Sequence, residues 1–292
     1  MTNPPRIMVA YIATGGGIDA LRLATTLAKN SGAAIDIVMV ATEGEVAPGI
    51  YPHDHGYSGL VEEQMGRWLA EAAAEVPADI EVTGHIVVGG SVATALIDKA
   101  GELNAQTIVV GSQGGGMFKR LTLGSVVNSL LHASPVPVAL APKGYNHPGP
   151  VERITVMFGP KPGATDIVEV GLRHSTDLGV PVRFVSLAIT GEKSTGTDAV
   201  AALRTTAGDR PARRAAELIF TGRATAEVIE APNVESAVGR LDWSAGDVVY
   251  MGSARLAPEG RLFLGSTATQ ILRHTPAPAI AVPNGYTTGA HE

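Results

Sequence analysis

The chain has 292 residues, a formal net charge of −6 and no cysteine. Its length predicts about two domains, and the missing cysteines exclude disulfides and thiol catalysis. The negative charge argues against a general nucleic-acid binder. No apolar run reaches the ~20 residues of a membrane helix, and no apolar signal-peptide core is found, so we expect a cytoplasmic protein.

The first half alternates apolar runs with amphipathic segments. It predicts strands at 6–12, 34–41, 80–88, 107–111 and 136–141, and helices at 18–31, 59–74, 91–100 and 125–133. Strands alternating with helices indicate right-handed crossovers and a parallel sheet, whose ligands bind beyond the carboxyl ends of the strands. An aromatic content of only 4% requires a core of Ala, Val, Leu and Ile, which suits such a sheet.

The loop after the first predicted strand is rich in glycine. It reads Thr14-Gly15-Gly16-Gly17, which indicates a tight strand-to-helix turn or a source of backbone amides for a ligand. Asp19 follows in the next helix, and we expect it to be solvated in the first helical turn.

A second glycine loop follows the fourth predicted strand. Gly111, Gly114, Gly124 and Ser125 have the spacing G-x2-G-x9-G-S, and a predicted helix begins at Gly124-Ser125. Glycines let backbone amides approach a phosphate, and Ser125 can cap the helix or donate its hydroxyl to a phosphate oxygen. The pattern therefore favours a nucleotide site.

Two cations lie between these glycines. Lys119 and Arg120 either neutralise phosphate charge or are solvated loop side chains, and we weigh the two interpretations equally. Arg261 stands at the position of Arg120 in the second half.

The second half repeats the first. Gly252 and Gly265 stand 141 residues after Gly111 and Gly124, and Ser266 follows. The repeat predicts strands at 153–158, 181–187, 225–230, 247–252 and 277–282, and helices at 164–178, 198–220, 234–241 and 267–274. A repeat this long indicates two fused domains, 1–145 and 150–285. The Gly- and Pro-rich segment 144–150 reads as their linker.

The glycine signature resembles the ATP-binding motif of the universal stress protein family, and the segment 134–142 resembles that family's closing strand. The resemblance implies two tandem, doubly wound domains, each with a five-stranded parallel sheet of the adenine nucleotide alpha hydrolase-like type. It also implies an adenine nucleotide, ATP with or without Mg²⁺, as the ligand. The candidate binding residues are Val40, Gly111, Gly114, Lys119, Arg120, Gly124, Ser125, Val126, Gly252, Gly265 and Ser266.

Three positions depart from the family pattern. Ile12 and Gly159 stand where family members that bind ATP carry an aspartate, and Arg255 replaces the second glycine of the C-terminal signature. Arg255 either blocks a phosphate or binds it bidentately. We expect the nucleotide mainly in the N-terminal half and an impaired or altered second site.

The sequence favours a stress-response regulatory protein that binds ATP. Alternatives are a nucleotide-independent stress or adaptor protein and, less favoured, a slow ATPase or an adenylating enzyme. No motif places a general base, and His53-Asp54-His55 reads as part of a loop rather than as a metal cluster.

The two closing strands, 136–141 and 277–282, are short, apolar and flanked by prolines. An open apolar edge invites pairing, so we expect these strands to pair. Within one chain the result is an internal pseudo-dimer, and between chains it is a swapped homodimer.

Overall fold

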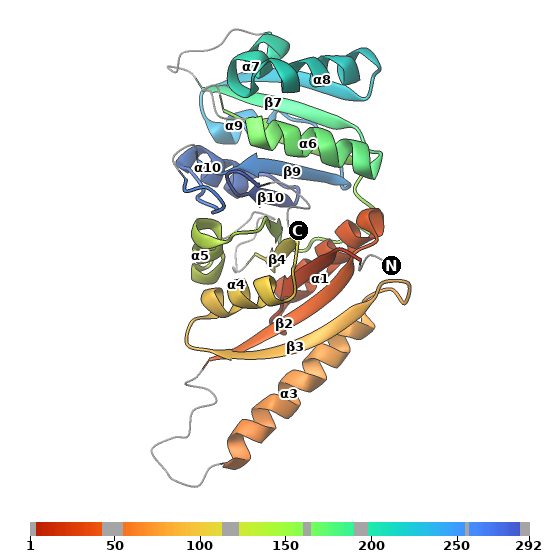
Figure 1. Cartoon of the computed structure of the whole chain (residues 1–292), viewed down its shortest axis with the longest axis vertical. Coiled ribbons are helices and arrows are strands. Elements are labelled where there is room, and N and C mark those ends of the chain that lie inside the picture. The colour runs from red at the N-terminus through yellow and green to blue at the C-terminus, as the bar shows by residue number, and fades with distance from the viewer. Residues whose placement is uncertain are drawn as a thin grey trace.

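The computed structural model describes residues 4–42, 55–112, 123–159, 165–189, 198–254 and 257–286, without the side chains of 55–58. The molecule is elongated, and its N-terminal and C-terminal halves occupy opposite ends (Figure 1). Among the described residues, no helix combines the length and the apolar composition of a membrane span.

A continuous ten-stranded sheet runs through both halves, in the order β3-β2-β1-β4-β5-β10-β9-β6-β7-β8. The first half contributes β1 (Arg6–Ala10), β2 (Ala34–Thr42), β3 (Val82–Gly89), β4 (Thr107–Gly111) and β5 (Val138–Ala141). The second contributes β6 (Arg153–Phe158), β7 (Val182–Ile189), β8 (Ala224–Ala231), β9 (Asp247–Gly252) and β10 (Ala279–Val282). Strand pairs within each half are parallel, as expected.

Helices cover both faces of the sheet, so each half is doubly wound. One face packs against α1 (Gly15–Ser31), α3 (His55–Ala74), α6 (Thr165–Leu178), α7 (Ala199–Ala207) and α8 (Asp209–Phe220). The other packs against α4 (Val92–Glu102), α5 (Ser125–Ala133), α9 (Val234–Gly239) and α10 (Ser266–His274). The two apolar clusters therefore correspond to the two faces.

The single helix predicted over 198–220 is wrong, because the chain forms two helices there. Gly208 ends α7 with a φ of 89°, a conformation that side chains with a Cβ rarely adopt, and α8 begins at the next residue. The other predicted strands and helices are present, with ends displaced by a few residues.

The predicted pairing of the closing strands is confirmed. β5 and β10 are antiparallel, and Ala139 lies opposite Ile280. Each strand begins two residues later than predicted, after Pro137 or Pro278, because proline donates no amide hydrogen to a ladder. The strands of the two halves run in opposite directions, so their carboxyl ends lie at opposite edges of the sheet.

The expectation that Asp19 is solvated is wrong. Its side chain is buried, and its Oδ2 accepts a hydrogen bond from the Gly144 amide at 2.7 Å. Burial raises the pKa of Asp19, while the Gly144 amide opposes the shift. In the second half, Asp166 on α6 accepts from the Gly285 amide at 2.9 Å, at the surface. Each half thus fastens the turn after its closing strand to its first helix.

The segment between the halves lies along α1 rather than crossing open solvent. Tyr145 is buried, Lys29 Nζ donates to the carbonyl of Pro148 at 2.6 Å, and Asn30 Oδ1 accepts from the Val151 amide at 2.6 Å. These contacts recur along one side of the helix and fix the second half relative to the first.

Candidate functional site

The end of β2 presents backbone groups beyond the end of β1. Ala10, the last residue of β1, lies opposite Val38, whereas β2 continues to Thr42. The Val38 carbonyl accepts from the Tyr11 amide at 2.9 Å. Because backbone groups alternate sides along a strand, the N–H and C=O of Val40 point to that same side, past the end of β1. A planar base with one donor and one acceptor on its edge fits such a strand segment.

Gly111 is required by packing. A Cβ on Gly111 would lie 1.8 Å from the carbonyl oxygen of Gly16, and one on Gly17 would lie 1.9 Å from that of Ile12. The predicted tight turn after β1 is therefore present, and its glycines bring the start of α1 against the end of β4. This contact explains the identity of Gly111 without reference to a ligand.

No side chain of a described residue caps the amino terminus of α5. Its N-cap is Gly124, with φ −75° and ψ 171°. Ser125 is therefore the first helical residue and not the cap. By contrast, Ser91 caps α4 by accepting from the Thr94 amide. The first-turn amides of a helix have no partner within the helix, and here Ser125 is exposed beside them while Val126 is half-buried.

The rest of the predicted phosphate loop lies outside the described residues. This applies to Gly114, Lys119 and Arg120, and also to His53 and Asp54 of the polar loop. No group of His, Asp and Glu side chains that could bind a metal ion occurs among the described residues.

No acidic side chain described near β1 takes the place of the missing aspartate. Ile12 follows β1 with 42% of its surface exposed. Asp19, the next acidic residue along the chain, is engaged with the Gly144 amide. An apolar side chain is therefore exposed where the family pattern has a carboxylate.

A groove of about 560 Å³ lies beside the end of β3, between this edge strand and α4. Val87 of β3 pairs with Val40 of β2, so the groove is one strand away from the backbone groups described above. Its lining includes Gly89 and Gly90 at the end of β3, and Asp98 and Lys99 of α4.

The corresponding loop in the second half is closed on itself. The Ala254 amide donates to the Phe263 carbonyl at 2.7 Å, and the Phe263 amide donates to Ser253 Oγ at 3.1 Å. These backbone donors are therefore occupied before any ligand binds. Gly265 caps α10 without a side-chain hydrogen bond in the described structure, and Ser266 is exposed.

A Cβ on Gly252 would lie 3.2 Å from Ile167 Cβ, a much milder approach than at Gly111. Arg255 lies outside the described residues, Arg261 is exposed, and Gly159 is exposed after β6.

The same loop contacts the first half, which sequence reasoning missed. The amides of Leu262 and Leu264 donate to the carbonyls of Ser134 and Leu131 at 2.9 and 3.2 Å. Both leucines are buried, and the Phe263 ring lies edge-on to His132 at 4.9 Å. The run of three apolar residues at 262–264, inside a loop, is the sequence signal for this contact.

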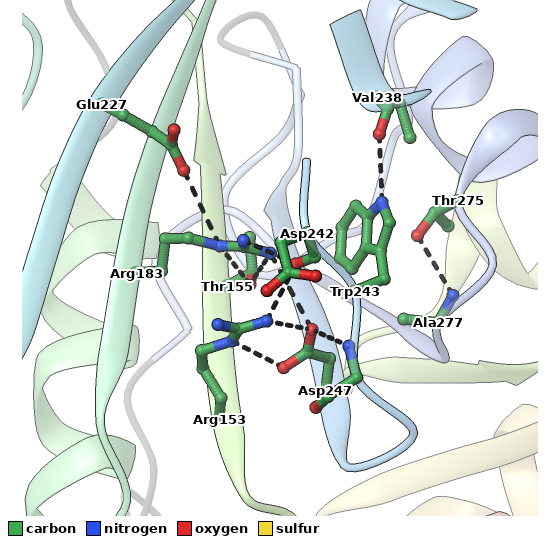
Figure 2. Close-up of polar contacts among 11 residues, drawn as sticks. Arg153, Thr155, Arg183, Glu227, Val238, Asp242, Trp243, Asp247, Thr275 and Ala277 are labelled. Carbon is green, nitrogen blue, oxygen red and sulfur yellow. Dashed lines mark hydrogen bonds and ion pairs between the residues drawn. The ribbon is translucent and has the colours of Figure 1, made fainter. Parts of the chain in front are cut away.

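A buried charged network lies at the amino-terminal ends of the C-terminal strands (Figure 2). Arg153 donates two hydrogen bonds to Asp247, at 2.7 and 2.6 Å. Arg183 donates to Thr155 Oγ1 and lies 5.1 Å from the centre of the Trp243 ring. Burial and the nearby Arg153 lower the pKa of Arg183. The side chains satisfy one another, so we assign the network to stability.

The N-terminal half also pairs the first arginine of its first strand with a buried carboxylate, but a different strand supplies that carboxylate. Arg6, which corresponds to Arg153, donates two hydrogen bonds to Asp36 of β2 at 2.7 and 2.6 Å. Burial alone would raise the pKa of Asp36, but hydrogen bonds from Arg6 and His85 outweigh it and lower the pKa. In the second half, Arg183 occupies the place of Asp36, and β9 supplies the carboxylate instead.

The model of the universal stress protein family matches residues 5–142 and again 150–283. A universal stress protein of Mycobacterium tuberculosis H37Rv is 27% identical over 290 residues, which is 95% of this chain and 99% of that protein. A universal stress protein structure from Archaeoglobus fulgidus superimposes with a TM-score of 0.71 at 19% identity, covering 96% and 98% of the two chains. A functionally unknown protein of Pseudomonas aeruginosa superimposes with a TM-score of 0.58 at 14% identity, covering 97% and 93%.

Proposed function

Because the chain belongs to the universal stress protein family as a tandem member, we propose that it is a regulatory protein that binds ATP in its N-terminal half. The nucleotide would occupy the edge formed by the ends of β1, β2 and β4 and the start of α5. We assign nucleotide binding to the domain formed by residues 1–145 and a supporting role to the domain formed by residues 150–285.

The observation that supports this proposal most directly is the amino terminus of α5, which has no side-chain cap among the described residues. Gly124 supplies no capping side chain, and the exposed Ser125 adds a hydroxyl beside the first-turn amides. A helix amino terminus attracts anions through its first-turn amides and its dipole. The backbone of Val40 offers a donor and an acceptor for adenine at the same edge. In this proposal Gly114, Lys119 and Arg120 complete the phosphate contact, and Mg²⁺ accompanies the nucleotide.

The second half would bind nucleotide more weakly or not at all. Ala254 and Phe263 use their amides within the loop, and Leu262 and Leu264 bind the other half. A phosphate that entered would have to displace these contacts. We therefore assign Gly252, Gly265 and Ser266 mainly to the interface and the start of α10.

The proposal is tested by Ser125→Pro, which removes the hydroxyl and the first amide of α5 together. Proline is favoured at the first helical position, and the extended Gly124 suits a residue before proline. We expect ATP affinity, measured by calorimetry with Mg²⁺, to fall about tenfold or more through the lost charge-assisted hydrogen bonds.

Ser266→Pro is the matched control, since Ser266 stands at the same position of the second repeat. It should leave the affinity of the first half unchanged. Equal binding by both variants and the wild type would contradict the proposal. Ser125→Ala then separates the hydroxyl from the amide.

The second candidate is a nucleotide-independent adaptor, which the exposed Ile12 and the packing role of Gly111 favour. Acid denaturation of the purified protein distinguishes the two, since an ATP-binding protein releases adenine nucleotide and an adaptor releases none. We propose at most slow hydrolysis, because the buried Asp19 is engaged with a backbone amide and is not free to act as a base.

A further inference from the structure

β3 is an edge strand, with β2 on one side and no described strand on the other (Figure 1). The Ile35 amide donates to the carbonyl of Glu81 at 2.8 Å. Backbone groups alternate sides along a strand, so the odd-numbered residues of β3 bond to β2. The N–H and C=O groups of Gly84, Ile86 and Val88 therefore point away from the sheet, along its open edge.

The repeat allows the two edge strands, β3 and β8, to be compared position by position. Val82 and Ala224 are their first paired residues and stand 142 residues apart. The caps of the helices that follow, Ser91 of α4 and Asn233 of α9, are separated by the same number. The counterpart of a residue in β3 or α4 is therefore found 142 positions later in the chain.

The edge of β8 is protected against pairing with another chain. The Val182 amide donates to the carbonyl of Arg223 at 3.2 Å, so the even-numbered residues of β8 point their backbone groups outward. One of these is Glu230, whose side chain is exposed and whose carbonyl accepts a hydrogen bond from Arg240 Nη1. Charged side chains and covered backbone groups are the usual protection of an edge strand.

The edge of β3 lacks both forms of protection. The strand contains no Asp, Glu, Lys or Arg. Val88 stands at the position of Glu230, with 55% of its surface exposed. Asp98 stands at the position of Arg240, and a carboxylate cannot donate to a carbonyl. Two acceptors, the outward carbonyl of Val88 and the exposed carboxylate of Asp98, therefore lie along the groove between β3 and α4.

We propose that the edge of β3 binds an extended peptide segment of a partner protein by strand addition, and that this segment places an arginine or lysine in the groove. The peptide backbone would pair with the open edge, and its side chains would alternate between the two faces of the sheet. This binding would not require a nucleotide.

The two faces beside β3 differ in chemistry, which defines the peptide. On one face, apolar side chains of the peptide would pack against Ile86 and the exposed Val88. On the other face lies the groove, where Lys99 is paired with Glu102 at 2.9 Å and Asp98 is exposed. A basic side chain there matches the charge of Asp98 and donates to both acceptors. The proposed ligand therefore alternates apolar residues with polar ones, at least one of them basic.

The charge preference is tested with the fluorescein-labelled peptide Ser-Val-Thr-Val-Arg-Val-Thr, titrated with the full-length protein by fluorescence anisotropy. We expect saturable binding, and at least about tenfold weaker binding of the same peptide with Glu in place of Arg. Asp98→Lys should reverse this preference, because the groove then carries the opposite charge.

Val88→Pro tests the backbone pairing. It removes an outward amide and keeps the amides that bond to β2, and proline is tolerated at such edge positions. We expect the affinity for the Arg peptide to fall at least about tenfold. Val88→Glu, which gives β3 the residue of β8, should have the same effect. Glu230→Pro is the matched control on β8 and should leave the affinity unchanged, and the melting temperature of each variant confirms folding.

The proposal would be overturned by a lack of saturable binding up to about 1 mM protein. Equal affinity for the Arg and Glu peptides, the same preference in Asp98→Lys, or undiminished binding by Val88→Pro and Val88→Glu would also overturn it. Sedimentation velocity tests a second copy of this chain as the occupant. A dimer that Val88→Pro converts into a monomer would show that the edge is already covered and would contradict a peptide ligand.

Discussion

The contact between Gly111 and Gly16 makes a sharp prediction about what the first signature glycine does. In Gly111→Ala, the new Cβ starts 1.8 Å from the Gly16 carbonyl oxygen, whereas such contacts are hardly ever below 3.0 Å. The end of β4 and the first turn of α1 must therefore separate by at least about 1.2 Å. Because both partners are backbone, no rotamer change relieves the contact. The cost should lie at the upper end of the overpacking range, about 3 kcal/mol.

Thermal unfolding followed by circular dichroism measures this cost. A loss of about 3 kcal/mol corresponds to a melting temperature lower by about 6–10 °C in a chain of this size. Gly252→Ala is the matched control. Its new Cβ starts 3.2 Å from Ile167 Cβ, so Ile167 needs to move by only a few tenths of an ångström. It should cost below about 1 kcal/mol. If Gly111→Ala melts like the wild type but loses ATP binding, the glycine serves the ligand and the packing argument is refuted.

Asp19→Ala removes a buried hydrogen bond to a backbone amide and should lower the unfolding free energy by about 2 kcal/mol. Asp166→Ala, at the exposed counterpart, should cost below about 1 kcal/mol in the same urea titration, and equal losses would contradict the difference in burial. Burial, with a smaller effect from Arg173, lowers the pKa of His174 to about 4 from 6.5, so between these values the unfolded chain binds a proton that the folded chain does not. The unfolding free energy should therefore be highest above about pH 6.5 and fall by up to about 3 kcal/mol as the pH drops toward 4. His174→Gln should make this decline smaller in denaturation curves taken across that pH range. Val138→Asp with Ala279→Asp places charges in the fully buried junction of the two halves and should raise the radius of gyration in small-angle scattering, and an unchanged radius and melting temperature would exclude these strands as the junction.

Repetition and periodicity predicted the tandem α/β fold and the pairing of the closing strands, because these depend on patterns that occur twice. The burial of the Asp19 side chain was not predictable from repetition or periodicity. An acidic residue early in a helix normally faces solvent, and its burial depends on Gly144, 125 residues later in the chain. The break at Gly208 was hidden because the segments on both sides of it have helical periodicity.

The candidate site was likewise predictable only in part from the sequence. Gly124 and Ser125 were located correctly at the start of a helix. The sequence left Ser125 as either the cap or a hydroxyl donor to a phosphate, and the structure has Gly124 as the cap. The glycine spacing also did not separate a role in packing from a role in binding, since both require the absence of a Cβ. That distinction needed the position of Gly16, which lies in the first turn of α1.

The antiparallel junction between β5 and β10 also sets an order on folding. Ala139 and Ile280, which pair there, are 141 residues apart, so this contact carries one of the largest loop-closure costs in the fold. During synthesis the first half can form its parallel strands while the edge of β5 stays open, until β9 and β10 have been made. An exposed apolar edge is then available to other chains. Pro135 and Pro137, just ahead of β5, shorten that edge, and so limit wrong pairing during the interval when the correct partner does not yet exist.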